Sequence, residues 1–144
     1  MTHENKELLI KDLCARLPYN VIIDYAHNAF DIRNEYYIKH ESKCILSCYL
    51  LDVFISSRQN EEDEYIKPYL FPLLSMTDKD LIEFLQIKGM NLDKLKTFRR
   101  EKIAIVSTLS SYSRHIDWLN AHHFDYRGLI EKGLAIDATN LNIY

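Results

Sequence analysis

The first regular pattern in the chain is a helical stripe of apolar residues near its start. Apolar side chains recur there at three- and four-residue intervals, which is the spacing of one face of an α-helix. The stripe consists of Leu8, Leu9, Ile10, Leu13, Cys14 and Leu17, and the other side carries Lys6, Glu7, Lys11, Asp12 and Arg16. The pattern predicts an amphipathic first helix that ends at Pro18, because proline cannot continue a helix.

Extended segments are expected next. Val21–Tyr25 is rich in β-branched and aromatic residues, which favour a strand. Ala26–Ala29 is a predicted turn, and Phe30–Ile38 gives a second, less regular extended segment. Lys43–Ser56 is the most apolar run, and its periodicity leaves open whether it is a buried strand or a buried helix. Its β-branched and aromatic residues favour the strand.

The middle of the chain combines an acidic run with two prolines. Arg58–Glu64 is acidic and turn-prone, which is more typical of a solvated loop than of a cation or partner site. In Tyr65–Met76, Pro68 and Pro72 exclude a regular helix interior and a central strand. This segment is therefore predicted to be extended and edge-like, laid on the core.

The second half of the chain contains several residues that can cap helices. Thr77 is a predicted cap for a helix that stops at Gly89, and Asn91 can cap another. The pattern from Ile103 to Leu109 fits either a continuation of that helix or a strand.

A further helix is predicted over Ser111–Phe124, with Ser110 or Ser111 as its cap. Asp125 then offers a cap for a shorter helix from about Tyr126 to Lys132, whose free amides it would satisfy.

The order of these elements places the chain in the α+β class, because strands precede helices rather than alternating with them. We expect an N-terminal helix, a small mainly antiparallel sheet from about Val21 to Ile55, and a helical C-terminal half. No repeat or linker interrupts residues 1–144, which are expected to form a single globular domain.

Composition adds three expectations. Eighteen basic and twenty-one acidic side chains give a net charge of −3, so no global basic field favours nucleic acid or an acidic membrane surface. Cys14, Cys44 and Cys48 are read as free thiols in a reducing compartment. No apolar run has the length of a signal peptide core or a membrane span, so the protein is expected to be cytoplasmic.

The most distinctive stretch is residues 117–130, which contains the single tryptophan. Its candidate binding residues are Trp118, His122, His123, Asp125 and Arg127. One interpretation is a pocket or recognition patch. The other is a helix–turn–helix corner in which Trp118 belongs to the core, Asp125 is a cap and Arg127 is its ion-pair partner.

A local excess of basic residues lies in residues 94–102. It consists of Lys94, Lys96, Arg99, Arg100 and Lys102, and this basic helix could lie on nucleic-acid phosphates. The alternative is a solvated helix face.

Catalytic and cofactor signals are weak. The two-turn separation of His115 and His122 is too long for one zinc ion, so no metal site is predicted. No glycine-rich phosphate loop is present, and no cofactor is expected. A small hydrolase or a metal site around His122, His123 and Asp125 remains an alternative, because Ser113, His122 and Asp125 form a triad on paper.

Three stretches resemble a family of small proteins from gut commensal bacteria and their phages or mobile elements. They are Lys11–Tyr19, Lys67–Leu70 followed by Ser75–Thr77, and Asp117–Ala135, together about a third of the chain. The chain departs from the family pattern at Phe71, where arginine is usual, and at Leu74, where serine is usual. The resemblance implies a shared fold and a phage or mobile-element setting, and it names no reaction.

The function expected from the sequence is that of a non-enzymatic protein-interaction module, such as a phage-related adaptor or an inhibitor of a host protein. Ten tyrosines support it, since tyrosine, tryptophan and arginine anchor interfaces. Tyr65 and Tyr69 lie on one side of their segment and are either an interface or part of the core. A protein partner is expected, a homo-oligomer is allowed, and nucleic acid and membrane are less favoured.

Overall fold

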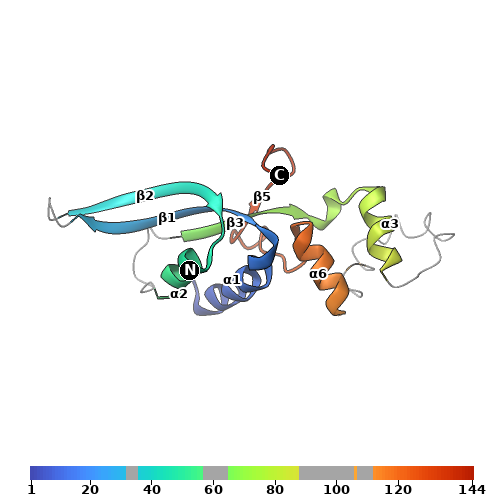
Figure 1. Ribbon diagram of the computed structural model, residues 1–144, viewed down its shortest axis with the longest axis horizontal. Helices are drawn as coiled ribbons and strands as arrows, with labels where there is room; N and C mark the ends of the chain where they lie inside the picture. Colours follow the sequence, from blue (N-terminus) through green and yellow to red (C-terminus); the bar gives the residue numbers. More distant parts are fainter. Residues whose placement is uncertain (32–35, 57–64, 88–105, 107–111) are drawn as a thin grey trace.

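The chain folds as an α+β domain with an N-terminal helix and one mixed, mostly antiparallel sheet (Figure 1). The structure is a computed structural model that describes residues 1–31, 36–56, 65–87, 106 and 112–144, without the side chains of residues 27–41. The helices are α1 (His3–Arg16), η1 (Leu17–Tyr19), α2 (Cys48–Ser56), η2 (Leu73–Ser75), α3 (Asp78–Gln86) and α6 (Ser113–Ala121). The strands are β1 (Ile22–Asp31), β2 (Tyr36–Ile45), β3 (Tyr65–Pro72), β4 (Phe124–Asp125) and β5 (Ile136–Asp137).

The five described strands are arranged in the order β2-β1-β3-β4, and β5 also pairs with β3. β1 and β2 form a long antiparallel hairpin that pairs from Ile22 with Ile45 to Asp31 with Tyr36. β3 runs antiparallel to β1 and parallel to β4 and β5. Because β3 contacts β1 only along residues 23–26, the outer half of the hairpin extends beyond the body of the domain (Figure 1).

The main core lies on one face of this sheet, where α1 and α2 pack (Figure 1). Its buried residues are Leu9, Leu13, Val21, Ile23, Leu46, Leu51, Phe54, Ile66, Leu70, Leu129, Leu134 and Ala135. A second cluster joins α3 and α6 to the end of the sheet and contains Met76, Leu81, Phe84, Leu85, Val106, Leu119 and Phe124. The predicted first helix is confirmed, and it supplies Leu9 and Leu13 to the main core.

The strand predicted for Lys43–Ser56 is wrong. β2 ends at Ile45, and Cys48–Ser56 forms the helix α2. Ser47 explains the change, because its hydroxyl accepts from the Leu50 amide at 3.2 Å and so caps the first turn. Leu51 and Phe54, three residues apart, then face the core. β-branched and aromatic residues favour a strand only weakly, so the packing of Leu51 and Phe54 in the core can select a helix here.

The predicted turn at Ala26–Ala29 is also wrong, because these residues continue β1. The polar residues His27 and Asn28 suggested a turn, but ladder pairing with His40 and Lys39 continues through them. Cross-strand pairing thus overrides the local turn preference.

β3 is an interior strand, not the predicted edge strand. Each of its prolines lies at the end of a ladder, where a missing amide costs least. Pairing of β3 with β1 ends at Pro68 opposite Ile23, and pairing with β4 ends at Pro72 opposite Asp125. The exclusion of a central strand therefore fails, because β3 changes partners at Pro68.

The described part of the C-terminal half is not mainly helical. The cap at Thr77 is confirmed as a capping box with Asp80. α6 begins at Ser113 after Tyr112, without the side-chain cap expected from Ser110 or Ser111. Residues 126–133 form bends and turns instead of the predicted helix. The predicted helix after Asn91 lies outside the described residues, as does the 103–109 segment except for the buried, helical Val106.

Candidate functional site

The candidate residues fall in two separate places. Trp118, His122, His123, Asp125 and Arg127 lie at the corner where α6 leads into β4, and this group is called the corner below. Tyr65 and Tyr69 lie on β3. The basic residues 94–102 lie outside the described residues.

Asp125 acts as the predicted cap, although it caps a series of turns. Its Oδ1 accepts from the amides of Arg127 at 3.3 Å and Leu129 at 2.9 Å, and its Oδ2 accepts from Ile130 at 2.8 Å. Asp125 is buried, so these amides form charge-assisted hydrogen bonds in a low-dielectric setting. Both carboxylate oxygens thus accept hydrogen bonds from the backbone, which is the role of a cap.

Arg127 pairs with Asp12 of α1, and not with Asp125 as predicted. Its Nε lies 3.1 Å from Asp12 Oδ1, although the N–H is not directed well enough for a hydrogen bond. Arg16 Nε donates to Asp12 Oδ2 at 2.7 Å, and Arg16 Nη2 donates to the Phe124 carbonyl at 2.8 Å. Asp12 and Arg16 are fully buried, each 0% exposed. The polar side assigned to the first helix is therefore not wholly solvated.

Tyr126 joins the two guanidinium groups. The Arg127 and Arg16 Cζ atoms lie 4.8 Å and 5.6 Å from its ring centroid, and Arg127 Nη2 donates to its hydroxyl at 2.8 Å. Two arginines are balanced by the carboxylates of Asp12 and Asp125, so this buried group needs no added anion for charge neutrality. It ties α1 to the 125–130 turns.

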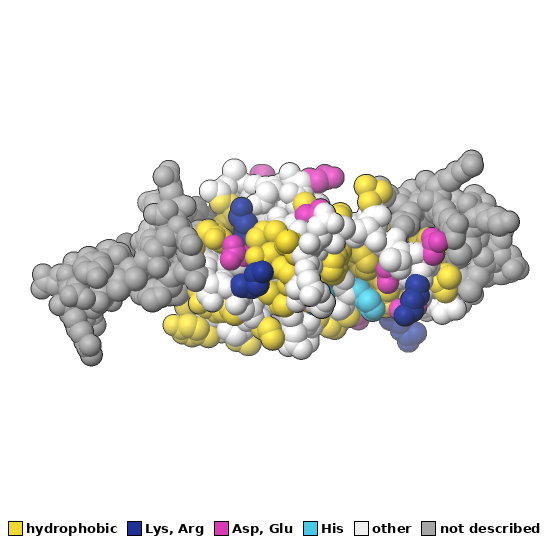
Figure 2. Space-filling model, turned by 90° about the horizontal axis from the view of Figure 1, so that it is seen from above, with side chains coloured by type: hydrophobic (Ala, Val, Ile, Leu, Met, Phe, Trp, Pro, Cys, Tyr) yellow, Lys and Arg dark blue, Asp and Glu magenta, His cyan; other side chains and the backbone are white. Residues whose placement is uncertain are grey.

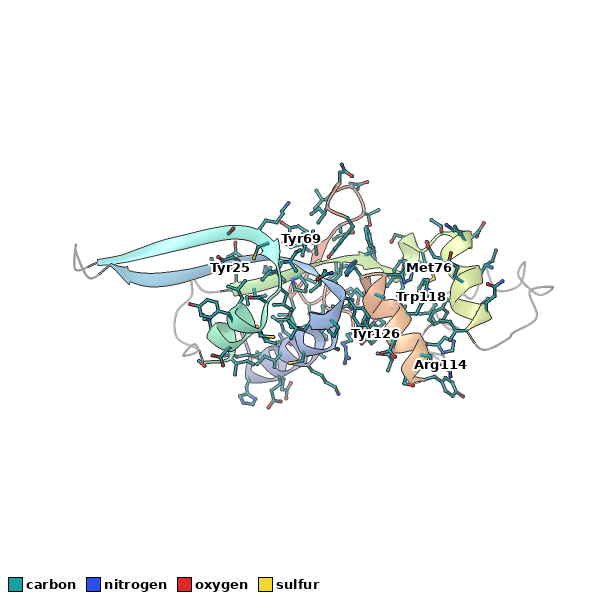
Figure 3. The ribbon with its side chains drawn as sticks, viewed as in Figure 1. Tyr25, Tyr69, Met76, Arg114, Trp118 and Tyr126 are labelled. Atoms are coloured by element: carbon teal, nitrogen blue, oxygen red, sulfur yellow. The ribbon has the colours of Figure 1, made fainter. Side chains whose placement is uncertain are left out.

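Trp118 packs in a stack of aromatic rings, as the core interpretation predicts. It lies parallel to His122 at 3.9 Å between centroids and parallel to Phe124 at 5.7 Å, with the edge of Phe84 at 5.5 Å. The His122 Nδ1–H donates to the Trp118 carbonyl at 2.9 Å, since a carbonyl can only accept. Figure 3 shows the labelled Trp118 on the side of α6 toward α3, and Tyr126 between α6 and α1.

His123 adopts a left-handed backbone conformation, with φ of 57°, and reverses the chain between α6 and β4. Its ring stacks on Tyr144 at 4.0 Å with an interplanar angle of 12°. Burial and the nearby positive charge of Arg16 lower the pKa of His123 to about 4. The imidazole is therefore neutral near pH 7.

Acid should weaken the fold through His123. Its pKa is lower in the folded state than the usual 6.5, so the neutral ring contributes stability above pH 6.5 that is lost as pH falls through 4. The ring is only partly buried and solvent screens its charge, so we expect the loss at pH 4 to be about 1–2 kcal/mol. Urea unfolding at pH 7 and pH 4 should show a smaller loss of unfolding free energy in His123→Asn than in wild type, because asparagine does not take up a proton. Asparagine is chosen because it tolerates the left-handed backbone. Equal losses in the two proteins would contradict the assignment.

The corner therefore has a structural explanation for each of its five residues. Asp125 is a cap, Arg127 is an ion-pair partner, and the rings of Trp118, His122 and His123 are stacked. The structure brings these residues together and gives each of them a packing or hydrogen-bonding role. This favours the packed-corner interpretation over a pocket.

Tyr65 and Tyr69 lie on the opposite side of the sheet from the main core. Along β3 they alternate with the buried Ile66 and Leu70, and alternate strand residues point to opposite faces. The face that carries the two tyrosines is called the outer face below. Tyr69 is buried, and the hydroxyl of Tyr65 donates to Asp24 Oδ2 at 3.1 Å.

A row of charged residues crosses the outer face. Asp24 of β1 is the ladder partner of both Lys43 on β2 and Lys67 on β3. The Lys43 ammonium lies 4.7 Å from the Tyr69 ring centroid, and the Lys67 ammonium lies 5.9 Å from that of Tyr65. Within the described residues, neither ammonium lies within ion-pair distance of a carboxylate. The row thus presents positive charge over aromatic rings.

Apolar side chains accompany this row. Figure 2, seen from above, shows hydrophobic side chains between basic and acidic ones on the face opposite α1 and α2. Ile45 on β2 is 54% exposed there, and Ile22 is half-buried. In the part of the chain that the structure describes, no helix covers this face (Figure 1).

Among the described residues, no three His, Cys, Asp or Glu side chains are placed to hold a metal ion. Cys14, Cys44 and Cys48 are free thiols, and burial raises the pKa of Cys44. No described helix is both long and apolar enough to cross a membrane.

Sequence reasoning missed two features of these sites. The burial of Asp12 and Arg16 gives no signal in the pattern of the first helix, where their i, i+4 spacing is equally typical of an exposed pair. The outer face had a signal, namely the alternation of Tyr65, Lys67 and Tyr69 with apolar residues. This alternation was not interpreted as an interior strand, because the two prolines indicated an edge strand.

No family model matches the chain, and no curated protein or solved structure shows a significant match to it.

Proposed function

We propose that this protein is a protein-interaction module that docks its partner on the outer face of the sheet. The observation that carries the proposal is the outer face itself, where Ile45 is exposed and, within the described residues, Lys43 and Lys67 lie over tyrosine rings with no carboxylate at ion-pair distance. Interfaces combine such apolar anchors with a polar rim. An adaptor or an inhibitor that acts by binding another protein could use this surface for that binding.

Two features favour a protein partner over nucleic acid at this face. Both tyrosine rings are engaged, Tyr69 by Lys43 and Tyr65 by Lys67, so neither is free for the base stacking that single strands require. The net charge of −3 also opposes a polyanion. The alternative site at residues 94–102 has no described structure to support it.

The test is affinity capture from lysate of the native host, with mass spectrometry. The amount of partner captured by the outer-face variant Ile45→Asp, Lys67→Glu should fall at least tenfold. A tenfold loss corresponds to about 1.4 kcal/mol, which a residue that anchors an interface can contribute. Leu74→Asp, Lys79→Glu makes the same chemical changes at Leu74, which is 72% exposed, and at the exposed Lys79.

This matched control should capture the partner as the wild type does. Both variants must first show wild-type melting temperatures. Capture that is unchanged in the outer-face variant, or that disappears after nuclease treatment, would contradict the proposal.

A further inference from the structure

Tyr144 occupies a defined site at the edge of the outer face. Its ring stacks on His123 at 4.0 Å and lies 5.7 Å from Phe71 at a tilt of 53°. Its hydroxyl donates to the Tyr69 carbonyl at 2.8 Å and accepts from the Ile22 amide at 3.1 Å. These four residues form what is called the Tyr144 seat below.

The hydroxyl lies where β1 and β3 separate. Their ladder ends at the pair of Ile23 with Pro68, and Ile22 and Tyr69 are one residue further on. The phenol bridges the amide of Ile22 and the carbonyl of Tyr69 in place of a direct ladder bond. A backbone donor and a backbone acceptor would otherwise each lack this partner, which is costly in a partly buried place.

The seat has specific chemical requirements. One small group must both donate and accept a hydrogen bond, and it must be attached to a flat ring that can stack on imidazole. A phenol meets these requirements, whereas a phenyl ring lacks both hydrogen bonds and an indole N–H only donates. Burial raises the pKa of Tyr144 to about 12, which agrees with a neutral, donating hydroxyl.

We propose that the Tyr144 seat is a phenol-binding site, which Tyr144 fills within its own chain and which accepts a phenolic ring from outside when Tyr144 is withdrawn. The ligand class is a free phenol or the tyrosine side chain of another polypeptide. Tyr144 is 44% exposed, so the site opens to solvent on one side and allows such an exchange. The seat adjoins the outer face through Tyr69 and Ile22, but the inference does not depend on the function proposed for that face.

The test uses Tyr144→Ala, which empties the seat, and p-cresol as the probe. Titration should shift the Ile22 amide and the His123 ring signals in nuclear magnetic resonance spectra and should saturate. Toluene, which has the same ring and methyl group without the hydroxyl, should bind at least fivefold more weakly, because it can form neither of the two hydrogen bonds. Wild type should show no such shifts, because its seat is filled.

A second arm distinguishes a free phenol from a tyrosine in a polypeptide. The peptide with the sequence of residues 139–144 should shift the same signals in Tyr144→Ala, and its copy with phenylalanine in place of tyrosine should not. If the peptide binds more tightly than p-cresol, the site recognises a tyrosine side chain together with its polypeptide backbone. If only p-cresol binds, the site is one for free phenols.

A loss of stability in the variant does not prevent the test. Ligand that binds only the folded state raises the melting temperature, so p-cresol should stabilise Tyr144→Ala and leave wild type unchanged. The proposal is overturned if p-cresol leaves the Ile22 and His123 signals and the melting temperature of the variant unchanged. It is equally overturned if toluene acts as strongly as p-cresol.

Discussion

Replacing Asp12 by alanine is expected to lower the free energy of unfolding by about 3–5 kcal/mol, the cost of breaking a buried ion pair from one side. Asp12 and Arg16 are both fully buried, and Asp12 is also the carboxylate nearest to the Arg127 guanidinium. Without Asp12, the Arg16 charge stays inside the protein, where the Phe124 carbonyl and the Tyr126 ring are its remaining partners among the described residues. Urea unfolding monitored by the fluorescence of the single tryptophan measures the effect.

Glu7 provides the matched control on the same helix. It forms an i, i+4 contact of 3.6 Å with His3, and both side chains are largely exposed. Glu7→Ala should therefore change stability little, because exposed pairs contribute little. A small effect of Asp12→Ala, comparable to that of Glu7→Ala, would show that the buried cluster is not needed to hold α1 to the corner.

Replacing Asp125 by alanine is expected to cost about 2–4 kcal/mol, because three backbone amides lose a charged acceptor in a buried setting. The amides belong to Arg127, Leu129 and Ile130, and Leu129 is a fully buried member of the main core. Loosening these turns also removes support from Arg127, which must reach back to Asp12. Thermal and urea unfolding measure the loss.

Asp137 is the matched control for Asp125. Its Oδ1 accepts from the Thr139 amide at 2.9 Å in an exposed turn, so water can replace it after Asp137→Ala. We expect a much smaller loss there. If the two alanine variants lose the same stability, Asp125 is an ordinary surface cap, and its possible role as a ligand-binding residue would have to be reopened.

Elements with strong local signals were predictable from the sequence. The apolar stripe of the first helix and the Thr77 cap act within a few residues of each other, and both are confirmed. The α+β class is confirmed, but the predicted order is wrong: the sheet does not end near Ile55, because β3, β4 and β5 follow helices and join it. The cap role of Asp125 was also predictable, since it depends on the residues that follow directly.

Features that depend on distant residues were not predictable. Lys43–Ser56 suits both a strand and a helix, and only packing of Leu51 and Phe54 under the sheet separates them. The partner of Arg127 is 115 positions away on α1, whereas the nearby Asp125 was the obvious candidate. Pro68 suggested an edge because the partner change at that position cannot be read locally.

The candidate site was predicted in part. Tyr65 and Tyr69 were placed on one side of their segment, and they do lie on one face of β3. The sequence could not show that α1 and α2 both pack against the other face, or that Lys43 and Lys67 meet the two rings from different strands. For the corner, the sequence left a pocket and a packed junction open, and the contacts favour the junction.

Lysine footprinting of the protein with its captured partner tests the docking proposal most directly. Acetylation of free and bound protein compares Lys43 and Lys67 on the outer face with Lys79 on α3, whose side chain is 86% exposed. The proposal predicts that the partner protects Lys43 and Lys67 and leaves Lys79 reactive. Protection of Lys79 with unchanged reactivity at Lys43 and Lys67 would contradict docking on the outer face.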